Sequence, residues 1–167
     1  MWWHKLKIIG GMVFLLAFAG CSTVTIGQLD ERVRTKLSSV AVVDTDGRAG
    51  QLYGRALRQA LYVYGQASPA YDLTSSISVS SSSTLSVRGV TSTFKKMSMV
   101  ASFTLTKQSG GDVLLRDTVT ADATLGTVSS LFGQDQSELH ARDLMATLLA
   151  QRVAQRVQLY FLEHADN

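Results

Sequence analysis

Four polar residues in one short stretch, Ser137, Glu138, His140 and Asp143, are of types that could act as nucleophile, acid and base. Ser137 and His140 are one helical turn apart, so their side chains could meet. No glycine-containing nucleophile elbow and no evident oxyanion hole accompanies them, however. The same residue types are typical of a helix N-terminus, where acidic side chains favour the helix dipole. We therefore favour a helix start and predict no catalytic residues and no enzymatic activity.

The rest of the sequence offers no metal or nucleotide site. His4 and His164 lie close to the two ends of the chain, which leaves His140 without other ligands at a recognisable metal-binding spacing. The single cysteine rules out a disulfide framework and a cysteine-based zinc site. Because neither a G-x-G-x-x-G pattern nor a P-loop occurs, we predict no metal and no cofactor.

That cysteine, Cys21, follows a segment with the proportions of a secretory signal peptide. Residues 1–20 have a short basic start and then an apolar run that is too short to span a bilayer comfortably. The run ends in Leu-Ala-Phe-Ala-Gly before Cys21, which resembles a bacterial lipobox. We expect cleavage before Cys21 and acylation of this residue, and two or more acyl chains give a stable membrane anchor. Ser22, in place of the Asp that retains Gram-negative lipoproteins at the inner membrane, predicts the periplasmic face of the outer membrane.

The charge balance excludes one class of partner. The formal net charge of +3 includes Lys5 and Lys7, both within the expected signal peptide. Without residues 1–20 the chain has 14 basic and 13 acidic residues, so the mature protein is almost neutral. A nearly balanced chain has no general electrostatic attraction for phosphate backbones, and we predict no nucleic-acid partner.

Beyond Cys21 the hydropathy pattern predicts a tether and then two short elements. Residues 22–36 are polar with scattered Val and Ile, and together with Cys21 they predict a tether with little structure of its own. The β-branched run over 37–43 predicts a strand. From about Arg48 to Tyr64 the apolar residues recur with helical spacing, and Gly65 follows where a C-cap favours a left-handed residue.

The middle of the chain alternates with a period of two residues. Apolar residues keep odd positions through three runs, 73–87, 97–105 and 113–125, with Asp117 as the exception. Composition alone would suggest a linker, since 13 of the 20 residues from 74 to 93 are Ser or Thr. The constant parity instead predicts three antiparallel strands with Gly-containing turns. One face of the resulting sheet is apolar and the other is lined by Ser and Thr.

A long helix completes the expected fold. Asp135, with Glu138 three residues later, predicts the helix start, and no Gly or Pro interrupts the sequence from there to about Glu163. Its apolar stripe would cover the apolar sheet face. Residues 37–167 therefore predict an α+β domain: a two-layer sandwich of one mostly antiparallel four-stranded sheet with two helices on one face, in the order β-α-β-β-β-α.

Two helix motifs within this element order resemble a known family. They are Gly-Arg-Ala-Gly-Gln-Leu at 47–52, followed by Arg-Ala-Leu-Arg-Gln-Ala-Leu at 55–61, and Glu-Leu-His-Ala-Arg-Asp-Leu-Met at 138–145. With the lipobox, these motifs resemble the LptE family of lipopolysaccharide-assembly lipoproteins, in particular its alphaproteobacterial branch. The chain departs from the commonest form after the cysteine, Gly-Phe-x-Pro-Leu-Tyr, where it has Ser-Thr-Val-Thr-Ile at 22–26.

The resemblance implies a partner and a ligand. LptE-like proteins lie as a plug inside the LptD β-barrel, help it to assemble, and take part in delivering lipopolysaccharide to the outer leaflet. The family is thought to contact lipopolysaccharide through basic residues near strand ends. In this chain the candidates by chemistry are Arg88, Lys95 and Lys96 at one end of the expected sheet and Lys107 and Arg116 at the other.

Two other functions remain open from the sequence. An accessory lipoprotein of an envelope phospholipid-transport system can have a similar α+β layout, but it would dock on a periplasmic tunnel protein. A lipid-anchored hydrolase would use Ser137 and His140.

Overall fold

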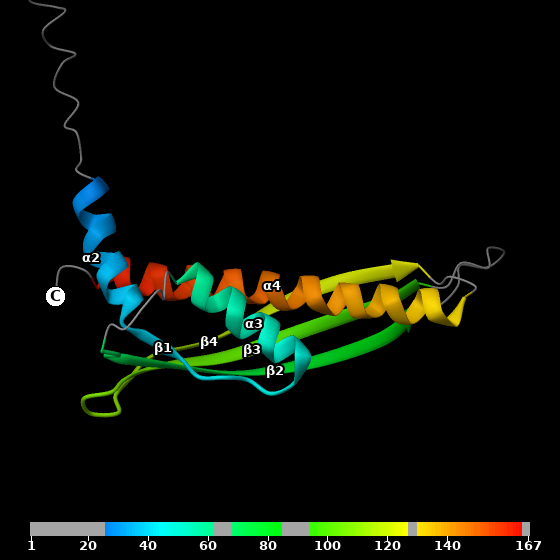
Figure 1. Cartoon of the computed structure of the whole chain (residues 1–167), viewed down its shortest axis with the longest axis horizontal. Coiled ribbons are helices and arrows are strands. Elements are labelled where there is room, and N and C mark those ends of the chain that lie inside the picture. Colours follow the sequence, from blue (N-terminus) through cyan, green and yellow to red (C-terminus); the bar gives the residue numbers. More distant parts are fainter. Residues whose placement is uncertain (1–25, 62–67, 85–93, 127–129, 165–167) are drawn as a thin grey trace, which may run out of the picture.

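The computed structural model describes residues 26–61, 68–84, 94–126 and 130–164. The elements in chain order are α2 (Ile26–Ser38), β1 (Val40–Val42), α3 (Gly47–Ala60), β2 (Tyr71–Thr84), β3 (Phe94–Lys107), β4 (Val113–Gly126) and α4 (Leu131–Glu163). In this part of the chain, helices α3 and α4 cover one face of a four-stranded sheet and α2 projects from one end of the helical layer, as Figure 1 shows. The predicted α+β class and the two-layer arrangement are confirmed.

The sheet is a long meander with one short parallel strand added. Its order is β1-β2-β3-β4, and only the β1–β2 pair is parallel. Strands β2, β3 and β4 have 14 residues each, which corresponds to a length of about 46 Å. The turn between β3 and β4 contains Gly111 at φ +73°, a left-handed conformation that favours glycine.

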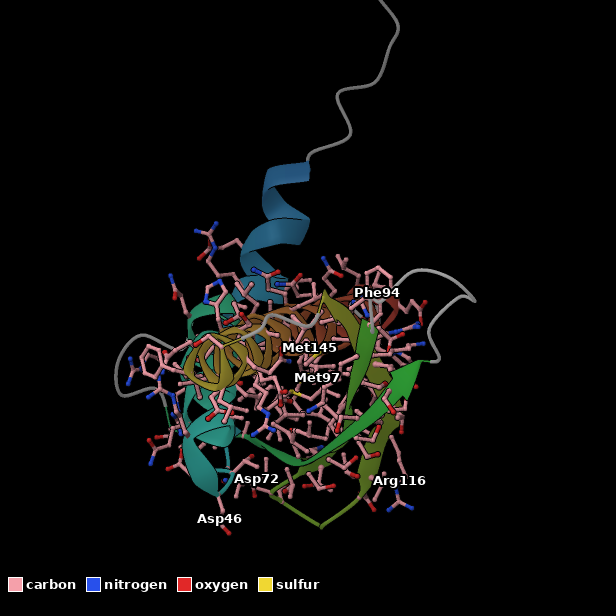
Figure 2. The ribbon with its side chains drawn as sticks, turned by 90° about the vertical axis from the view of Figure 1, so that its right-hand side faces the viewer. Asp46, Asp72, Phe94, Met97, Arg116 and Met145 are labelled. Carbon is pink, nitrogen blue, oxygen red and sulfur yellow. The ribbon has the colours of Figure 1, made fainter. Side chains whose placement is uncertain are left out.

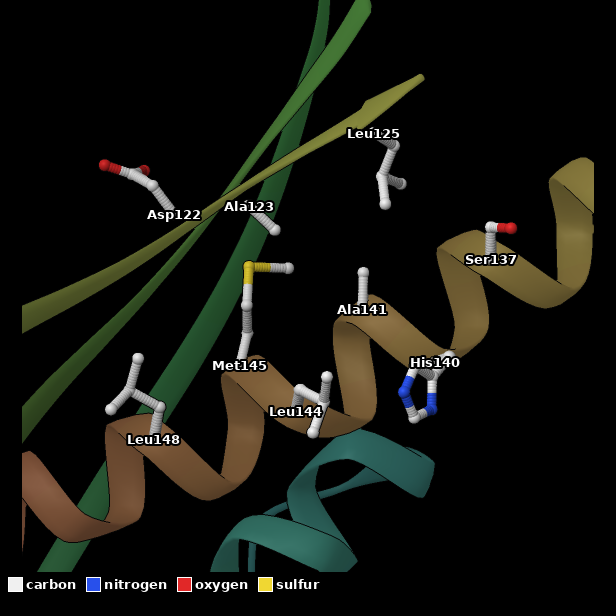
Figure 3. A pocket seen from close by; sticks show the side chains of 9 residues that line it. All are labelled: Asp122, Ala123, Leu125, Ser137, His140, Ala141, Leu144, Met145 and Leu148. Atoms are coloured by element: carbon white, nitrogen blue, oxygen red, sulfur yellow. The ribbon is translucent and has the colours of Figure 1, made fainter. Parts of the chain in front are cut away.

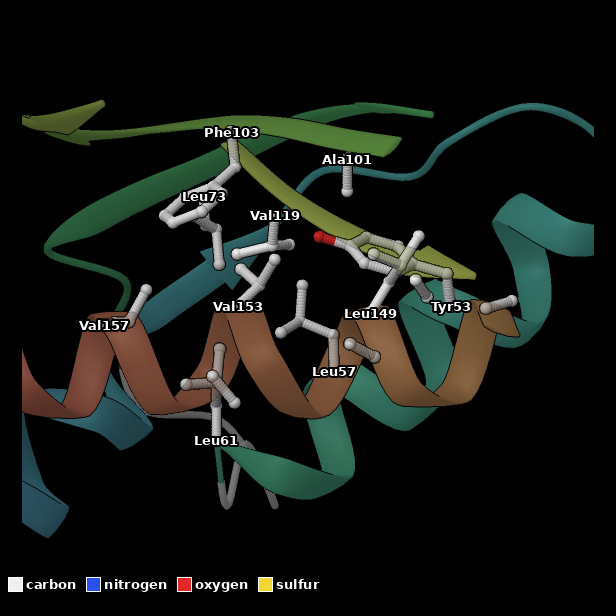
Figure 4. Packing of buried hydrophobic residues seen from close by; sticks show 14 of the residues in the cluster. Tyr53, Leu57, Leu61, Leu73, Ala101, Phe103, Val119, Leu149, Val153 and Val157 are labelled. Atoms are coloured by element: carbon white, nitrogen blue, oxygen red, sulfur yellow. The ribbon is translucent and has the colours of Figure 1, made fainter. Parts of the chain in front are cut away.

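The apolar core fills the space between the sheet and the helices, as Figure 4 shows. Odd-numbered apolar residues of the three long strands point into it, so the predicted alternation is confirmed over most of their length. One exception is the start of β4, where a register shift pairs Val113 with Thr106 and leaves the Val113 side chain exposed, contrary to its predicted inward position. On the sheet side, Leu73, Phe103 and Val119 pack toward Leu149 and Val153 of α4. Figure 4 also labels Tyr53, Leu57 and Leu61 of the α3 segment, Ala101 of β3 and Val157 of α4.

The phenol of Tyr53 is the side-chain polar group within the core of the described residues. Its hydroxyl donates to the Ser75 Oγ at 2.9 Å, which satisfies the only polar atom of this side chain. Burial raises the pKa of Tyr53 because it disfavours the phenolate. Ser75 has the parity of the apolar residues, and this contact explains why a serine is accepted on the inner side of β2.

The expected tether is the main error in the predicted fold. Residues 26–38 form α2, a third helix where we predicted little structure. Val33 and Leu37 are buried, and the Lys36 Nζ donates to the His164 carbonyl oxygen at 3.1 Å. The segment is helical because it packs against the end of α4, a tertiary contact that the local sequence does not reveal.

Three predicted boundaries also move. Strand β1 is limited to Val40–Val42, because 37–38 belong to α2. Helix α3 ends at Ala60 with Leu61 as its C-cap, so it stops before Tyr64, and Gly65 lies outside the described residues. Helix α4 begins at Leu131, and its N-cap is Ser130 instead of the predicted Asp135. The Ser130 hydroxyl accepts a hydrogen bond from the Gly133 N–H. At 33 residues α4 is about 50 Å long.

No helix in the described part of the chain is both long enough and apolar enough to cross a membrane. Helix α4 has the length, but charged side chains such as Arg152 and Arg156 occupy its exposed faces outside the apolar stripe.

Two glycines of α3 provide a matched test of how this helix packs. A Cβ on Gly50 would lie 2.7 Å from the Thr45 carbonyl carbon, and the backbone there cannot move aside cheaply. A Cβ on Gly54 would meet only the side chains of Arg58 and Asp44, at ordinary contact distances. We expect Gly50→Ala to lower the free energy of unfolding by about 2 kcal/mol, and Gly54→Ala to raise it by about 1 kcal/mol through helix propensity. Urea unfolding followed by circular dichroism measures both, and equal effects would contradict this packing.

Candidate functional site: the hydroxyl face of the sheet

The sheet face turned away from the helices is lined mainly by hydroxyl groups. Even-numbered residues of β2, β3 and β4 form five rows across this face, and 11 of these 15 side chains are Ser or Thr. We call these 15 residues the hydroxyl face. From one end of the sheet to the other, the rows are Thr74, Thr104 and Arg116; Ser76, Ser102 and Thr118; Ser78, Val100 and Thr120; Ser80, Ser98 and Asp122; and Ser82, Lys96 and Thr124.

Most of the hydroxyl groups keep hydrogen-bonding capacity for a partner. In the second row, Ser102 Oγ and Thr118 Oγ1 lie 3.1 Å apart and share one hydrogen bond. The Ser80 Oγ lies 3.5 Å from the Ser98 carbonyl oxygen. Because each hydroxyl is one donor and two acceptors, such a surface can match polar groups of either kind. The charged members of the face are Arg116 in the first row, Asp122 in the fourth and Lys96 in the fifth, so the second and third rows carry no charge.

Lys95 and Lys96 lie at the same end of the sheet but on opposite faces. Lys96 belongs to the hydroxyl face; it is half exposed and lies 3.8 Å from the Asp122 carboxylate. Lys95 turns toward the helices, where its Nζ donates to Glu138 Oε1 at 2.7 Å. Of the basic candidates at this end, Arg88 lies outside the described residues. Lys95 is therefore engaged within the fold, and Lys96 is the candidate available to a ligand.

Lys107 and Arg116 lie at the opposite end of the sheet, as the meander predicts. In the strand register, Lys107 lies opposite Tyr71 at the start of β2. Arg116 lies opposite Thr104, one row further into the sheet. Both side chains are exposed, and Figure 2 shows Arg116 projecting away from the layer that contains Met97 and Met145. Their role in binding lipopolysaccharide stays a prediction.

Three of the four residues that suggested catalysis, Ser137, Glu138 and Asp143, make structural contacts at the start of α4. The Ser137 Oγ donates to the Gly133 carbonyl oxygen at 2.8 Å, and His140 is exposed. Asp143 forms an ion pair with Arg48 of α3 at 3.0 Å. No hydrogen bond joins Ser137 to His140 in the described structure, and the described residues contain no cluster of His, Cys, Asp and Glu suited to a metal ion.

Helix α4 also closes part of the β4 edge, which the sequence did not predict. The Arg152 guanidinium donates to the Thr120 carbonyl oxygen, and Arg156 pairs with Asp117 at 3.3 Å. This second pair explains why Asp117 departs from the apolar parity of β4. In the sequence, the spacing of Arg152 and Arg156 by one helical turn indicates only that they share a face of α4. Which strand they contact depends on how α4 lies over the sheet.

Glu138 gives the fold a pH dependence with a definite sign. Hydrogen bonds from Lys95 and then Gln134 lower the pKa of Glu138 below the ordinary value of a glutamate side chain. A carboxyl whose pKa is lower in the folded state stabilises that state above the unfolded pKa, and this contribution is lost as the pH falls through the folded pKa. We expect the melting temperature of Glu138→Gln to lie below that of the unaltered protein at pH 7. The two should converge below about pH 4. A constant difference across this range would contradict the assignment.

Comparison with known proteins identifies the family. The LptE family model, described as lipopolysaccharide-assembly, matches residues 35–157, which include the whole sheet, α3 and most of α4. This match covers well over half of the chain, and the chain belongs to the LptE family. The protein is therefore a lipoprotein of lipopolysaccharide assembly in the cell envelope, in a family whose members are not enzymes. The family prediction made from the two helix motifs and the lipobox is confirmed. No curated protein sequence matches the chain.

Two solved structures share the fold. A Caulobacter crescentus CB15 chain, described as a lipoprotein, has a TM-score of 0.64 at 17% identity, over 79% of this chain and 96% of that one. The minor lipoprotein from Acinetobacter baumannii has a TM-score of 0.57 at 13% identity, over 73% of this chain and 92% of its own. At such low identity these matches concern the fold alone.

Proposed function

We propose that this protein is anchored in the outer membrane through acylated Cys21 and acts there as the plug of an LptD-like β-barrel. Its hydroxyl face lies against the polar inner wall of the barrel. In this position it helps the barrel to assemble and assists the delivery of lipopolysaccharide to the outer leaflet. The family supports a role in lipopolysaccharide assembly, and the hydroxyl face is the observation that carries the proposal to a barrel lumen.

The composition of the hydroxyl face suits a wet interface better than free solvent exposure. An ordinary exposed sheet face has many charged side chains, whereas the middle three rows here contain Asp122 as their only charge. Bringing Ser and Thr against a partner costs little side-chain entropy, and it avoids the removal of charges from water. The lumens of outer-membrane barrels are polar, and bridging waters would connect their groups to these hydroxyls.

The position of the lipid anchor gives the two ends of the sheet different surroundings. Cys21 precedes the first residue of α2 by five positions, which limits its distance from α2 to about 18 Å. Helix α2 lies at the end of the sheet where β1 and the β3–β4 turn are found, as Figure 1 shows. Lys107 and Arg116 therefore belong to the anchored end, and Lys96 belongs to the far end.

Basic residues of the far end are the proposed contacts for lipopolysaccharide phosphates. We expect Arg88→Ala with Lys96→Ala to weaken binding of purified lipopolysaccharide roughly tenfold at low salt, and less at high salt, because exposed charges are screened. Lys107→Ala with Arg116→Ala removes the same charge from the anchored end and is the control. An equal loss of lipopolysaccharide binding in both double variants would indicate general electrostatic attraction and contradict a defined site. Unchanged binding in the Arg88→Ala, Lys96→Ala variant would show that the binding site is not at the far end.

Purification of the full-length chain tests the proposed partner. The protein would be extracted from outer membranes in mild detergent through a C-terminal tag, with Cys21→Ser as the variant that cannot be acylated. We expect one large β-barrel in stoichiometric amount with the unaltered protein, and loss of outer-membrane recovery for Cys21→Ser. Recovery alone, or with a periplasmic phospholipid-transport protein, would contradict the plug function.

A further inference from the structure

We infer that the last six residues of β4 accept one more strand, supplied by an extended segment of the outer-membrane partner. Strand β4 is at the edge of the sheet, so one side of its backbone has no neighbouring strand. An unpaired edge is a template for another chain unless side chains close it. The inference rests on the proposed function, because the occupant is a segment of the barrel protein.

The backbone groups that point outward from β4 can be assigned. In an antiparallel pair, residues alternate between those bonded to the neighbouring strand and those whose N–H and C=O point away from it. The Thr120 carbonyl oxygen accepts from Arg152, and the Thr118 N–H donates to the Asp117 Oδ1 at 2.7 Å. Both groups therefore point outward. By the same alternation, the N–H and C=O of Asp122 and Thr124 also point outward.

The edge of β4 is consequently closed over one half and open over the other. In the half that we call closed, one outward group of each residue is occupied: the Thr118 N–H donates to the Asp117 side chain, and the Thr120 carbonyl oxygen accepts from Arg152. Arg156 pairs with Asp117 there. For the outward backbone groups of Asp122 and Thr124, the described part of the structure contains no comparable side-chain partner. The open half therefore retains two donors and two acceptors at the spacing of a β-ladder.

An apolar groove of about 420 Å³ runs beside the open half, between β4 and α4. Figure 3 shows Ala123 and Leu125 on the strand facing Ala141 and Met145 on the helix. Farther along α4, Leu144 and Leu148 extend the apolar wall and are 58% and 38% exposed. The polar residues at the groove are Asp122, Ser137 and His140.

The open backbone and the apolar groove together favour a strand as the occupant. An added strand would bond to Asp122 and Thr124, place alternate side chains in the groove, and extend the hydroxyl face with the others. A lipid chain would fill the groove but leave the four backbone groups without partners. The required segment is extended, with an apolar residue toward Leu144 and Leu148 and polar residues on either side of it.

The other sheet edge lacks this combination. Strand β1 pairs with β2 only over Tyr71–Leu73, so the far half of β2 is also an edge. There, however, the inward-parity residues Ser81 and Ser83 are polar and exposed. Among the described residues, the pocket nearest to this edge contains Ile77 and Val79, but its wall also carries the charged side chains of Asp46, Arg48, Arg142 and Asp143. The inference is therefore limited to β4.

Proline substitution separates the two halves of the β4 edge. Thr124→Pro removes an outward N–H from the open half, and Thr118→Pro removes one from the closed half, both at edge positions that tolerate proline. In the lipidated full-length chain we expect Thr124→Pro to lower recovery of the barrel roughly tenfold, since it deletes a ladder hydrogen bond and obstructs strand addition. Both changes also remove one hydroxyl group from the hydroxyl face, so Thr118→Pro measures that loss alone and should lower recovery much less than Thr124→Pro. Hydrogen exchange should show the Thr124 N–H protected in the complex and exposed in the lipoprotein alone.

The outcomes distinguish this inference from the proposed function. Equal recovery with both proline variants, while the unaltered protein still recovers the barrel, would overturn the added strand and leave the plug function intact. Failure to recover any barrel with the unaltered protein would overturn both. Protection of the Thr124 N–H without the barrel would assign the open edge to a second copy of this chain and overturn the inference. Leu144→Ser, at a half-exposed position, should also weaken recovery, and an unchanged yield would count against the groove.

Discussion

A glutamate in the middle of the hydroxyl face is expected to abolish recovery of the β-barrel. Ser102 is exposed and belongs to a row without charges, between Ser76 and Thr118. Ser102→Glu would bring an unpaired carboxylate into the interface, and removing such a charge from water costs several kcal/mol. The barrel recovered per tagged lipoprotein should fall at least a hundredfold, measured on purified outer-membrane extracts.

The control for this variant carries the same charge on another surface. Gln59 is exposed on α3, in the layer on the other side of the sheet, so Gln59→Glu should leave recovery unchanged. Both variants should keep the melting temperature of the unaltered protein, because both side chains are exposed. Equal recovery with the two variants would contradict the assignment of the hydroxyl face to the interface.

The second large effect concerns the core that holds α4 on the sheet. Leu149 is fully buried among residues of α3, β3 and β4, as Figure 4 shows. Leu149→Ala removes three buried carbon atoms and leaves a cavity, and we expect it to lower the free energy of unfolding by about 3 kcal/mol. Urea unfolding of the mature chain in mild detergent measures the change.

The neighbouring residue supplies the control for the core prediction. Leu148 precedes Leu149 on α4 but is 38% exposed at the rim of the groove. Leu148→Ala makes the same chemical change and should cost less than about 1 kcal/mol. A similar loss for both variants would show that α4 is not oriented as described.

Period-two parity made most of the sheet predictable, because a long strand with one buried face must alternate. The same parity also separates Lys95 from Lys96. Lys95 has the odd parity of Met97 and Met99, and the structure places it on the helix side, paired with Glu138. The two lysines therefore do not form one cluster, although they lie at the same end of the sheet. Their opposite parity in the sequence already indicates that they lie on opposite faces.

The helix boundaries were less predictable because tertiary contacts decide them. Residues 26–38 have few apolar side chains, and only the packing of Val33 and Leu37 makes them a helix. At α4, Ser130 and Asp135 are both residue types that cap helices, and the structure uses the earlier one although Leu131 and Phe132 then remain exposed. The closed half of the β4 edge was equally hidden, since it requires Arg152 to reach a strand distant in the sequence.

Site-specific photo-cross-linking in growing cells tests the central claim most directly. A photoreactive amino acid would replace Ser76, Ser78 or Ser102 on the hydroxyl face, and Arg55, Gln59 or Gln155 on the exposed side of the helices. We expect the first three positions to cross-link to one large outer-membrane β-barrel, through peptides of its inner wall, and the last three to give little product. Cross-links confined to the helix positions, with none from the hydroxyl face, would contradict the account.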